Sequence, residues 1–196
     1  MLLDDKAIRN LLLERLNSYK NCCVYEEVTV PSGKARADLV AVNGHVTAYE
    51  IKSDHDSLSR LGNQIAEYDL NFERNFIVVG EKFSSKIESI VPKYWGIVVV
   101  HGNTHDQLKM SFIRQAKLNP NLSFNSFLGM LTSDQVKYLA KKIDVETNKI
   151  SKTGIQKMFK QEVIKYISAH STKGMKVELK RVIREVLKGR NIREVL

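Results

Sequence analysis

The chain has 196 residues, of which 43% are hydrophobic and 27% charged, a composition that can bury a core and that excludes collagen-like and linker-like chains. Its formal net charge is +9, no apolar run approaches the roughly 20 residues of a membrane-spanning helix, and acidic residues follow Met1 where a secretory signal is basic. The two cysteines, Cys22 and Cys23, are adjacent and therefore poorly placed for a disulfide, so we expect a protein of the reducing cytoplasm. Because no apolar run is long enough to span a bilayer, we expect no membrane partner.

Helix and strand signals alternate in the first half of the chain and predict a mixed sheet with helices on its faces. Turn residues at 31–33 (Pro-Ser-Gly) and 43–44 (Asn-Gly) separate three β-prone segments, which favours an antiparallel meander. Later strands alternate with helices, and strand–helix–strand units usually lie parallel. In chain order we expect a helix at 2–17, strands at 23–30, 35–42 and 46–52, a helix at 57–73, a strand at 75–79, a helix at 84–91 and a strand at 96–100.

The second half of the chain is predicted to be helical and carries all of the excess positive charge. Residues 1–100 hold 12 basic and 14 acidic side chains, a net charge of −2, whereas residues 101–196 hold 19 and 8, a net charge of +11. Basic surfaces bind nucleic acid because each phosphate contact releases a counterion, although a solvated lysine-rich surface would have the same composition. We expect an α/β domain at 1–105 and a basic helical region at 106–196, with helices near 107–118, 123–130, 133–143, 153–168 and 176–188.

Three charged residues of the predicted meander can converge on one face of the sheet. Strand alternation places Glu50 and Lys52 on the same side, and Asp38 of the preceding strand can meet Glu50 across a short hairpin. Two carboxylates form a hard oxygen site for Mg²⁺ or Mn²⁺, and a neighbouring lysine can orient water and stabilise charge on a phosphate. An isolated Glu-x-Lys pair is more often a surface salt bridge that contributes about 0–1 kcal/mol.

The predicted helix at 57–73 can add polar groups to the same cleft. Arg60, Gln64 and Tyr68 recur every four residues and therefore form one polar stripe. Because this helix directly follows the strand with Glu50 and Lys52, its stripe can line a cleft shared with the carboxylates. Ordinary hydrogen bonding on the helix surface is the alternative explanation for the stripe.

A longer string of residues extends around the acidic pair. It reads Gly33-x-x-Arg36-x-Asp38, then Tyr49-Glu50-Ile51-Lys52-Ser53-Asp54-x-Asp56-x-Leu58-x-Arg60-Leu61, then Gln64 and Tyr68, with Val78-Val79-Gly80 and Pro92-Lys93-Tyr94-Trp95-Gly96-Ile97 further on. This string resembles the PD-(D/E)XK nuclease superfamily, and in particular a small bacterial branch known mostly from genome sequences. The resemblance covers about residues 5–98, with Ala37 before Asp38 where the superfamily's name has proline. It implies a restriction-endonuclease-like core with the element order αβββαβ.

The resemblance also implies a metal held by Asp38, Glu50 and the backbone carbonyl of Ile51, with Lys52 positioning water and stabilising charge. The implied catalytic residues are Asp38, Glu50, Lys52 and Gln64. A further acid often comes from the first helix or first strand of this fold. Glu27 is the choice in this chain, with Glu14 and Glu26 as alternatives.

The predicted substrate contacts lie in both halves of the chain, and residues 133–168 faintly resemble a helix–extended–helix DNA-binding module. These contacts are Arg36, Arg60, Tyr68, Lys141, Lys142, Lys152 and Lys157. The predicted function is that of a Mg²⁺- or Mn²⁺-dependent endonuclease that hydrolyses phosphodiester bonds, with DNA as the expected substrate. Many relatives of this fold act as homodimers, so a second copy is a candidate partner. Two alternatives stay open: a catalytically silent nucleic-acid-binding protein, and a structural protein with a solvated basic surface.

Overall fold

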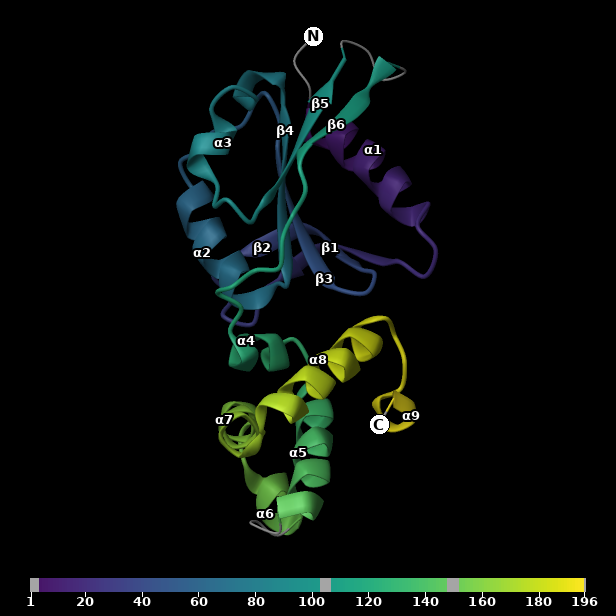
Figure 1. Cartoon of the computed structure of the whole chain (residues 1–196), viewed down its shortest axis with the longest axis vertical. Helices are drawn as coiled ribbons and strands as arrows, with labels where there is room; N and C mark the ends of the chain where they lie inside the picture. The colour runs from purple at the N-terminus through teal and green to yellow at the C-terminus, as the bar shows by residue number, and fades with distance from the viewer. Residues whose placement is uncertain (1–3, 103–106, 148–151, 196) are drawn as a thin grey trace. The chain divides into compact units, whose positions relative to one another are not determined.

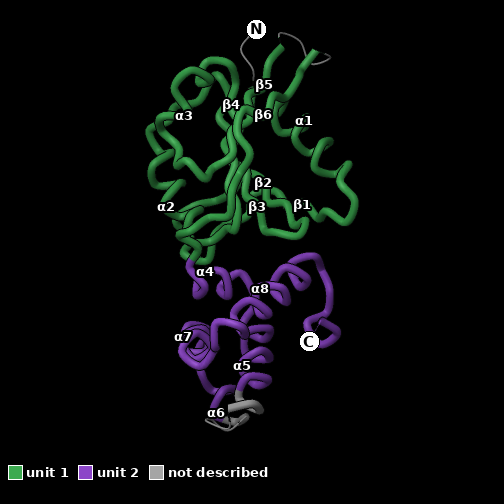
Figure 2. The backbone as a smooth tube through the Cα atoms, in the orientation of Figure 1, with its two compact units in different colours: residues 1–122 green, residues 123–196 purple. Residues whose placement is uncertain are grey.

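The computed structural model describes residues 4–102, 107–147 and 152–195. The chain divides into two compact units, Met1–Leu122 and Ser123–Leu196 (Figure 2). The first is a mixed α/β unit, as the sequence predicts. Its elements are α1 (Asp5–Asn17), β1 (Cys23–Thr29), β2 (Arg36–Val42), β3 (Val46–Lys52), α2 (Leu61–Asn71), β4 (Arg74–Gly80), the 3₁₀ helix η1 (Glu81–Phe83), α3 (Ile87–Ile90), β5 (Gly96–His101) and β6 (Lys109–Arg114).

Within the described residues, six strands form one mixed sheet in the order β1-β2-β3-β4-β5-β6. The first three strands make the predicted antiparallel meander. The pairs β3–β4 and β4–β5 are parallel, as predicted for strands joined by helical connections. Both turns of the meander contain a glycine with positive φ, Gly33 and Gly44, a conformation that glycine adopts at little cost.

The segment after β5 is a strand and not the helix predicted near 107–118. β6 pairs antiparallel with β5, and Val98 lies opposite Phe112 while Val100 lies opposite Met110. Both β6 side chains pack against the buried cluster formed with α1. Pairing and burial therefore outweigh the local helical signal, as is common for strands.

The α/β unit consequently extends beyond the expected boundary at residue 105. Asn119 links the segment after β6 to the end of α2. Its side-chain amide donates to the backbone carbonyls of Asp69 at 2.7 Å and Phe72 at 2.8 Å. The carboxylate of Asp69 is itself buried and accepts a hydrogen bond from Trp95 Nε1 at 2.8 Å. These bonds tie the chain after β6 to α2 and to the start of β5, so the division between the units falls after Leu122.

Helices cover both faces of the sheet, with α1 on one face and α2 and α3 on the other (Figure 1). Leu12 and its neighbours on α1 are buried against Leu39 of β2 and Ile51 of β3. Because side chains alternate along a strand, Asp38 and Glu50 point to the other side of the sheet, toward α2. The fold thus places the two acids under a polar helix face.

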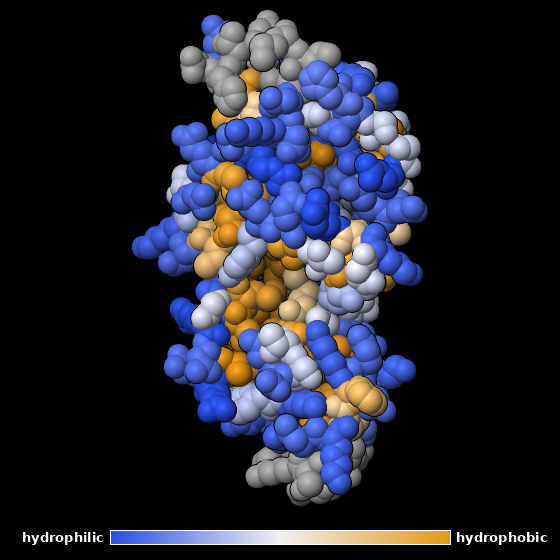
Figure 3. Space-filling model, turned by 180° about the vertical axis from the view of Figure 1, so that it is seen from behind, coloured by the Kyte–Doolittle hydropathy of each residue, from blue (hydrophilic) through white to orange (hydrophobic). Residues whose placement is uncertain are grey.

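The described part of the second unit is helical, as predicted, and α5 packs against α7. The region predicted as one helix at 153–168 is two helices, and the last short helix was not expected. On the face shown in Figure 3, hydrophilic side chains cover most of this unit. None of the described helices is long and apolar enough to span a bilayer. The helices are α4 (Phe124–Gly129), α5 (Ser133–Thr147), α6 (Lys152–Lys157), α7 (Lys160–His170), α8 (Lys173–Leu187) and α9 (Ile192–Val195).

Candidate functional site

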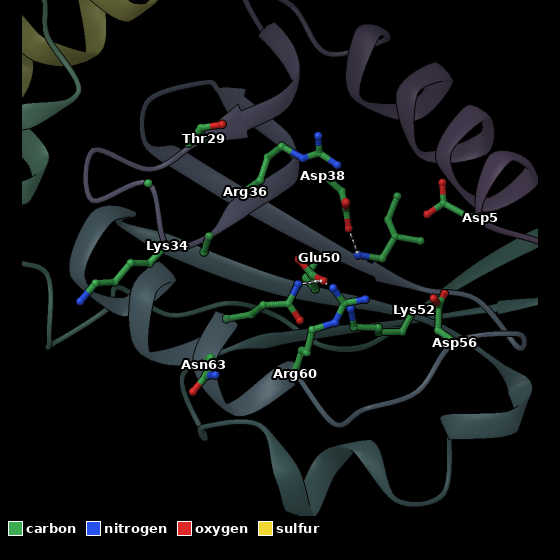
Figure 4. A pocket seen from close by; sticks show the side chains of 14 residues that line it. Asp5, Thr29, Lys34, Arg36, Asp38, Glu50, Lys52, Asp56, Arg60 and Asn63 are labelled. Carbon is green, nitrogen blue, oxygen red and sulfur yellow. Dashed lines mark hydrogen bonds and ion pairs between the residues drawn. The ribbon is translucent and has the colours of Figure 1, made fainter.

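Two of the predicted acids, Asp38 and Glu50, line an open cavity of about 590 Å³ in the α/β unit (Figure 4). The β2–β3 ladder ends at the pair Leu39–Tyr49, and Asp38 and Glu50 are the next residues along the two strands. The convergence expected from strand alternation is therefore present. The cavity is lined by Asp5, Thr29, Gly33, Lys34, Ala35, Arg36, Asp38, Glu50, Ile51, Lys52, Asp56, Arg60, Asn63 and Gln64.

Glu50 is the buried centre of this site, with 1% of its surface exposed. Lys52 Nζ donates to Glu50 Oε1 at 2.6 Å, and the side-chain amide of Gln64 donates to the same oxygen. The hydroxyl group of Tyr68 donates to Glu50 Oε2. A buried carboxylate needs such partners, because losing its water shell is costly when no charge or donor replaces it. The polar stripe of α2 thus faces the acids, as its spacing predicts.

Asp38 lies beside Glu50 and is held by the backbone and by α1. The amide of Ile51 donates to Asp38 Oδ2 at 2.7 Å. Arg9 donates to the Asp38 carbonyl at 3.0 Å, and its guanidinium lies 3.4 Å from Asp38 Oδ1. Burial, and then the negative charge of Glu50, raises the pKa of Asp38 to about 7. A cation bound between the two carboxylates would relieve this repulsion.

Tyr68, a predicted substrate contact, is fully buried. Its single hydroxyl hydrogen is shared between Glu50 and the carbonyl oxygen of Arg36, which lies 2.9 Å from the hydroxyl oxygen, and its ring stacks on Trp95 with 5.9 Å between centroids. Burial and the nearby Glu50 carboxylate raise the pKa of Tyr68, so it remains a neutral donor. Tyr68 therefore positions Glu50 and does not reach a ligand in the cavity.

Gln64 carries an unpaired acceptor in the cavity wall. Its Oε1 atom is buried and has no hydrogen-bond partner among the described residues, while its Nε2 atom donates to Glu50. A buried carbonyl oxygen normally has a donor. The amide group of Gln64 is therefore only half satisfied in its present orientation, and its water-orienting role stays a prediction.

The third predicted acid, Glu27, forms ion pairs with two arginines and does not line the cavity. Its backbone has a φ of +56°, in the left-handed region that residues other than glycine seldom adopt. Its carboxylate pairs with Arg9 at 3.0 Å and with Arg36 at 2.6 Å. Of the alternatives, Glu26 lies 3.9 Å from Arg9, and Glu14 is exposed on α1 and does not line the cavity.

Besides Lys52, three cationic side chains are among the residues that line the cavity. Arg36 and Arg60 line it, as predicted, and Lys34 joins them from the turn between β1 and β2 (Figure 4). The side chain of Arg36 is 63% exposed and can reach a ligand outside the cavity. The remaining predicted contacts are lysines of the helical unit: Lys141, Lys142 and Lys157, whereas the side chain of Lys152 lies outside the described residues.

Arg9 and Asp5 were missed by the sequence analysis. They pair at 3.1 Å, four residues apart on α1, and Asp5 lines the cavity. Their helical spacing predicts this ion pair, but no local pattern links Arg9 to Asp38, which is 29 residues away. Lys34 and Asn63 were also missed, because each is a single polar residue in a turn or on an exposed helix surface.

Asp38 and Glu50 fit a divalent metal, whereas Glu27 does not. Both acids offer the oxygen donors that Mg²⁺ and Mn²⁺ prefer, and both line one cavity. In the described part of the chain, no group of three His, Cys, Asp or Glu side chains could hold an ion. A metal bound here would therefore rely on two carboxylates, the Ile51 carbonyl and water, and Mg²⁺ commonly keeps several waters.

The loop after Lys52 is braced against the end of β4. Asp56 accepts hydrogen bonds from the backbone amide of Ser53 at 2.8 Å and from its hydroxyl group at 2.6 Å. The buried Asp54 packs directly on Gly80, where an added Cβ atom would lie 2.2 Å from Asp54 Oδ1. A side chain at position 80 is therefore incompatible with the present loop.

We expect Gly80→Ala to displace this loop and to destabilise the α/β unit by about 1–3 kcal/mol, the usual cost of overpacking. Urea unfolding followed by the emission of Trp95 measures the effect, because Trp95 is the sole tryptophan and is buried in this unit. Gly62→Ala is the matched control, since a Cβ atom there meets nothing within 4 Å. Equal stability of Gly80→Ala and the unsubstituted protein would contradict this packing argument.

Comparisons with known proteins identify the family of the chain. Protein cII of Enterobacteria phage P4 is 30% identical over 141 residues, which is 70% of this chain and 53% of that protein, so the chain spans about half the length of this curated relative. A protein of unknown function from Silicibacter pomeroyi, SPO1766, matches with a TM-score of 0.38 and 17% identity over 65% of this chain and 81% of its own. The profile described as Bacteriophage P4 protein cII matches residues 2–194, and the chain therefore belongs to the bacteriophage P4 protein cII family.

Proposed function

We propose that the chain is a metal-dependent nuclease with a PD-(D/E)XK, restriction-endonuclease-like core, and that DNA is its substrate. One observation carries the proposal: Asp38 and Glu50 line one cavity, with Lys52 Nζ 2.6 Å from Glu50. A buried and a half-buried carboxylate with an adjacent ammonium group, in a cavity that Lys34, Arg36 and Arg60 also line, suit a divalent ion and a phosphate together.

The side chains of the cavity have separate roles in this proposal. Mg²⁺ or Mn²⁺, held by Asp38, Glu50 and the Ile51 carbonyl, supplies Lewis-acid activation of water and neutralises phosphate charge. Lys52 stabilises the negative charge that develops on the phosphate oxygens as water attacks. The Oε1 atom of Gln64 is buried and unpaired, so in this proposal the side chain turns toward the cavity to accept a hydrogen bond from that water and orient it. Tyr68 fixes the rotamer of Glu50 from the buried side.

The cavity cations and the helical unit hold the substrate in this proposal. Lys34, Arg36 and Arg60 line the cavity and, in this proposal, bind phosphates that flank the scissile bond. The helical unit adds phosphate contacts through lysines such as Lys141 and Lys157. A cytoplasmic location and action as a homodimer belong to the same proposal.

A catalytically silent nucleic-acid-binding protein is the second candidate. One observation favours it: both carboxylate oxygens of Glu50 already accept hydrogen bonds, from Lys52, Gln64 and Tyr68. In a silent protein, Lys52 would serve as a permanent counterion of Glu50. In an enzyme, Lys52 must turn toward the phosphate when the metal binds.

A cleavage assay separates the two candidates. Supercoiled plasmid, linear duplex, single strands, a branched junction and RNA are each incubated with Mg²⁺, Mn²⁺ or EDTA. We expect metal-dependent cleavage of a DNA substrate that EDTA stops. Salt-dependent binding to these substrates with no cleavage under either metal would favour the silent protein instead.

A further inference from the structure

The helical unit carries the whole net charge of the protein. Residues 123–196 contain 16 basic and 7 acidic side chains, a net charge of +9, whereas residues 1–122 contain 15 of each. The proposed nuclease cavity lies in the neutral unit, so it does not explain this excess. A concentrated positive field attracts polyanions, and a concave surface within it localises them.

One cleft of the helical unit gathers three of these cations. Lys137 and Lys141 of α5 and Arg193 of α9 line a hollow of about 310 Å³, which we call the basic cleft. Asp134 is the single carboxylate in its lining. Tyr138 also lines the basic cleft and offers an aromatic ring.

The cations of the basic cleft are available to a ligand. Lys137 Nζ donates to the carbonyl of Gln156 at 2.9 Å, which fixes the head group and leaves two of its N–H donors. Within the described residues, neither Lys141 nor Arg193 forms an ion pair, whereas Arg181 pairs with its neighbour Glu178 at 2.5 Å. Among the described residues that line the cleft, Asp134 is therefore the one acid that offsets this positive charge.

We propose that the basic cleft binds the phosphodiester backbone of nucleic acid. The guanidinium fork of Arg193 matches two phosphate oxygens, and Lys137 and Lys141 add point charges beside it. Tyr138 supplies a flat surface for a sugar or base next to that phosphate. Lys142, whose ammonium group lies 5.8 Å from the centroid of the Tyr138 ring, adds charge at the edge of the cleft. This inference rests on the nucleic-acid binding of the proposed function and names the surface of the helical unit that performs it, and binding here needs no metal and no chemistry.

The test measures binding without cleavage. The full chain is titrated in EDTA against a fluorescein-labelled, mixed-sequence DNA strand and against its duplex, and binding is followed by fluorescence anisotropy at several salt concentrations. The strand has about 16 nucleotides, which is near the upper limit of the site size of one small binding module. The test variant is Lys141→Gln with Arg193→Gln. The matched control is Lys165→Gln with Lys173→Gln, which removes the same charge from exposed positions of the helical unit outside the cleft.

We expect the cleft variant to bind the single strand about 25-fold more weakly at ~0.1 M salt. Each lost phosphate contact lowers the slope of log affinity against log salt by about 0.7, so two lost contacts lower it by about 1.4, which is about 25-fold over the tenfold range from ~1 M to ~0.1 M salt. The slope itself should fall by about one to two, whereas the control should change neither quantity by a comparable amount. Equal losses in both variants would show a diffuse basic surface and overturn the proposal. Unchanged binding of the cleft variant would overturn it as well, and neither result depends on whether the α/β unit cleaves DNA.

Discussion

Lys52→Met will reduce metal-dependent DNA cleavage by about 100- to 1,000-fold, the usual effect of removing one group that stabilises transition-state charge. Lys52 is the one cation in contact with Glu50 among the described residues, and its side chain is 12% exposed. Methionine keeps the length and apolar stem of lysine but removes its charge. Gln64 and Tyr68 still donate to Glu50 in this variant, so the α/β unit should fold.

The matched control for Lys52→Met is Lys93→Met, an exposed lysine of the same unit that does not line the cavity. Both variants should show the far-ultraviolet circular dichroism and Trp95 emission of the unsubstituted protein. DNA binding in EDTA should also be unchanged in both, which separates a loss of chemistry from a loss of affinity. Full cleavage by a folded Lys52→Met protein would contradict the role proposed for Lys52 in this cavity.

The acid pair could be predicted from sequence because only local rules place it. Side chains alternate with a period of two along a strand, and the turn at Asn43 and Gly44 sets the register that brings Val42 opposite Val46. Once that register is fixed, Asp38 and Glu50 must lie side by side. The same reasoning predicted that Gln64 and Tyr68 face the acids from one side of a helix.

Contacts between distant segments could not be predicted in this way. Arg9 approaches Asp38 from α1, and nothing in the sequence around either residue indicates that contact. Tyr68 was predicted to contact substrate but is buried, because Trp95, the residue before β5, stacks on its ring. β6 was predicted as a helix, because its strand conformation depends on pairing with β5. In each case a partner remote in sequence decides the outcome.

The Asp38→Asn variant should be more stable than the unsubstituted metal-free protein near pH 8, although it should lose cleavage. Burial and Glu50 raise the pKa of Asp38 from 3.8 to about 7. Between these values the folded protein keeps a proton that the unfolded chain has lost, so stability falls as the pH rises from about 4 to about 7. At 1.36 kcal/mol per pKa unit the penalty approaches about 4 kcal/mol, and partial exposure of the site reduces it to about 2–4 kcal/mol.

Asparagine cannot ionise, so it escapes this penalty while its side-chain oxygen can still accept the hydrogen bond from Ile51. Urea unfolding of the metal-free proteins, followed by Trp95 emission at pH 5 and pH 8, measures the difference. We expect Asp38→Asn to gain about 2–4 kcal/mol at pH 8 relative to the unsubstituted protein and much less at pH 5. Glu14→Gln, a change at an exposed carboxylate outside the cavity, is the control and should show no such dependence.

Magnesium gives the same pair of proteins a second readout that does not depend on activity. A ligand that binds only the folded state stabilises it in proportion to the logarithm of its concentration. Mg²⁺ at pH 8 should therefore stabilise the unsubstituted protein, in which two carboxylates face the cavity, and have little effect on Asp38→Asn. Equal stabilisation of both proteins would exclude Asp38 as a metal ligand, whereas a less stable Asp38→Asn protein at pH 8 would contradict the repulsion between Asp38 and Glu50. The expected pattern, a loss of cleavage together with a gain in stability, would show that the fold retains an unfavourable carboxylate because the reaction needs it.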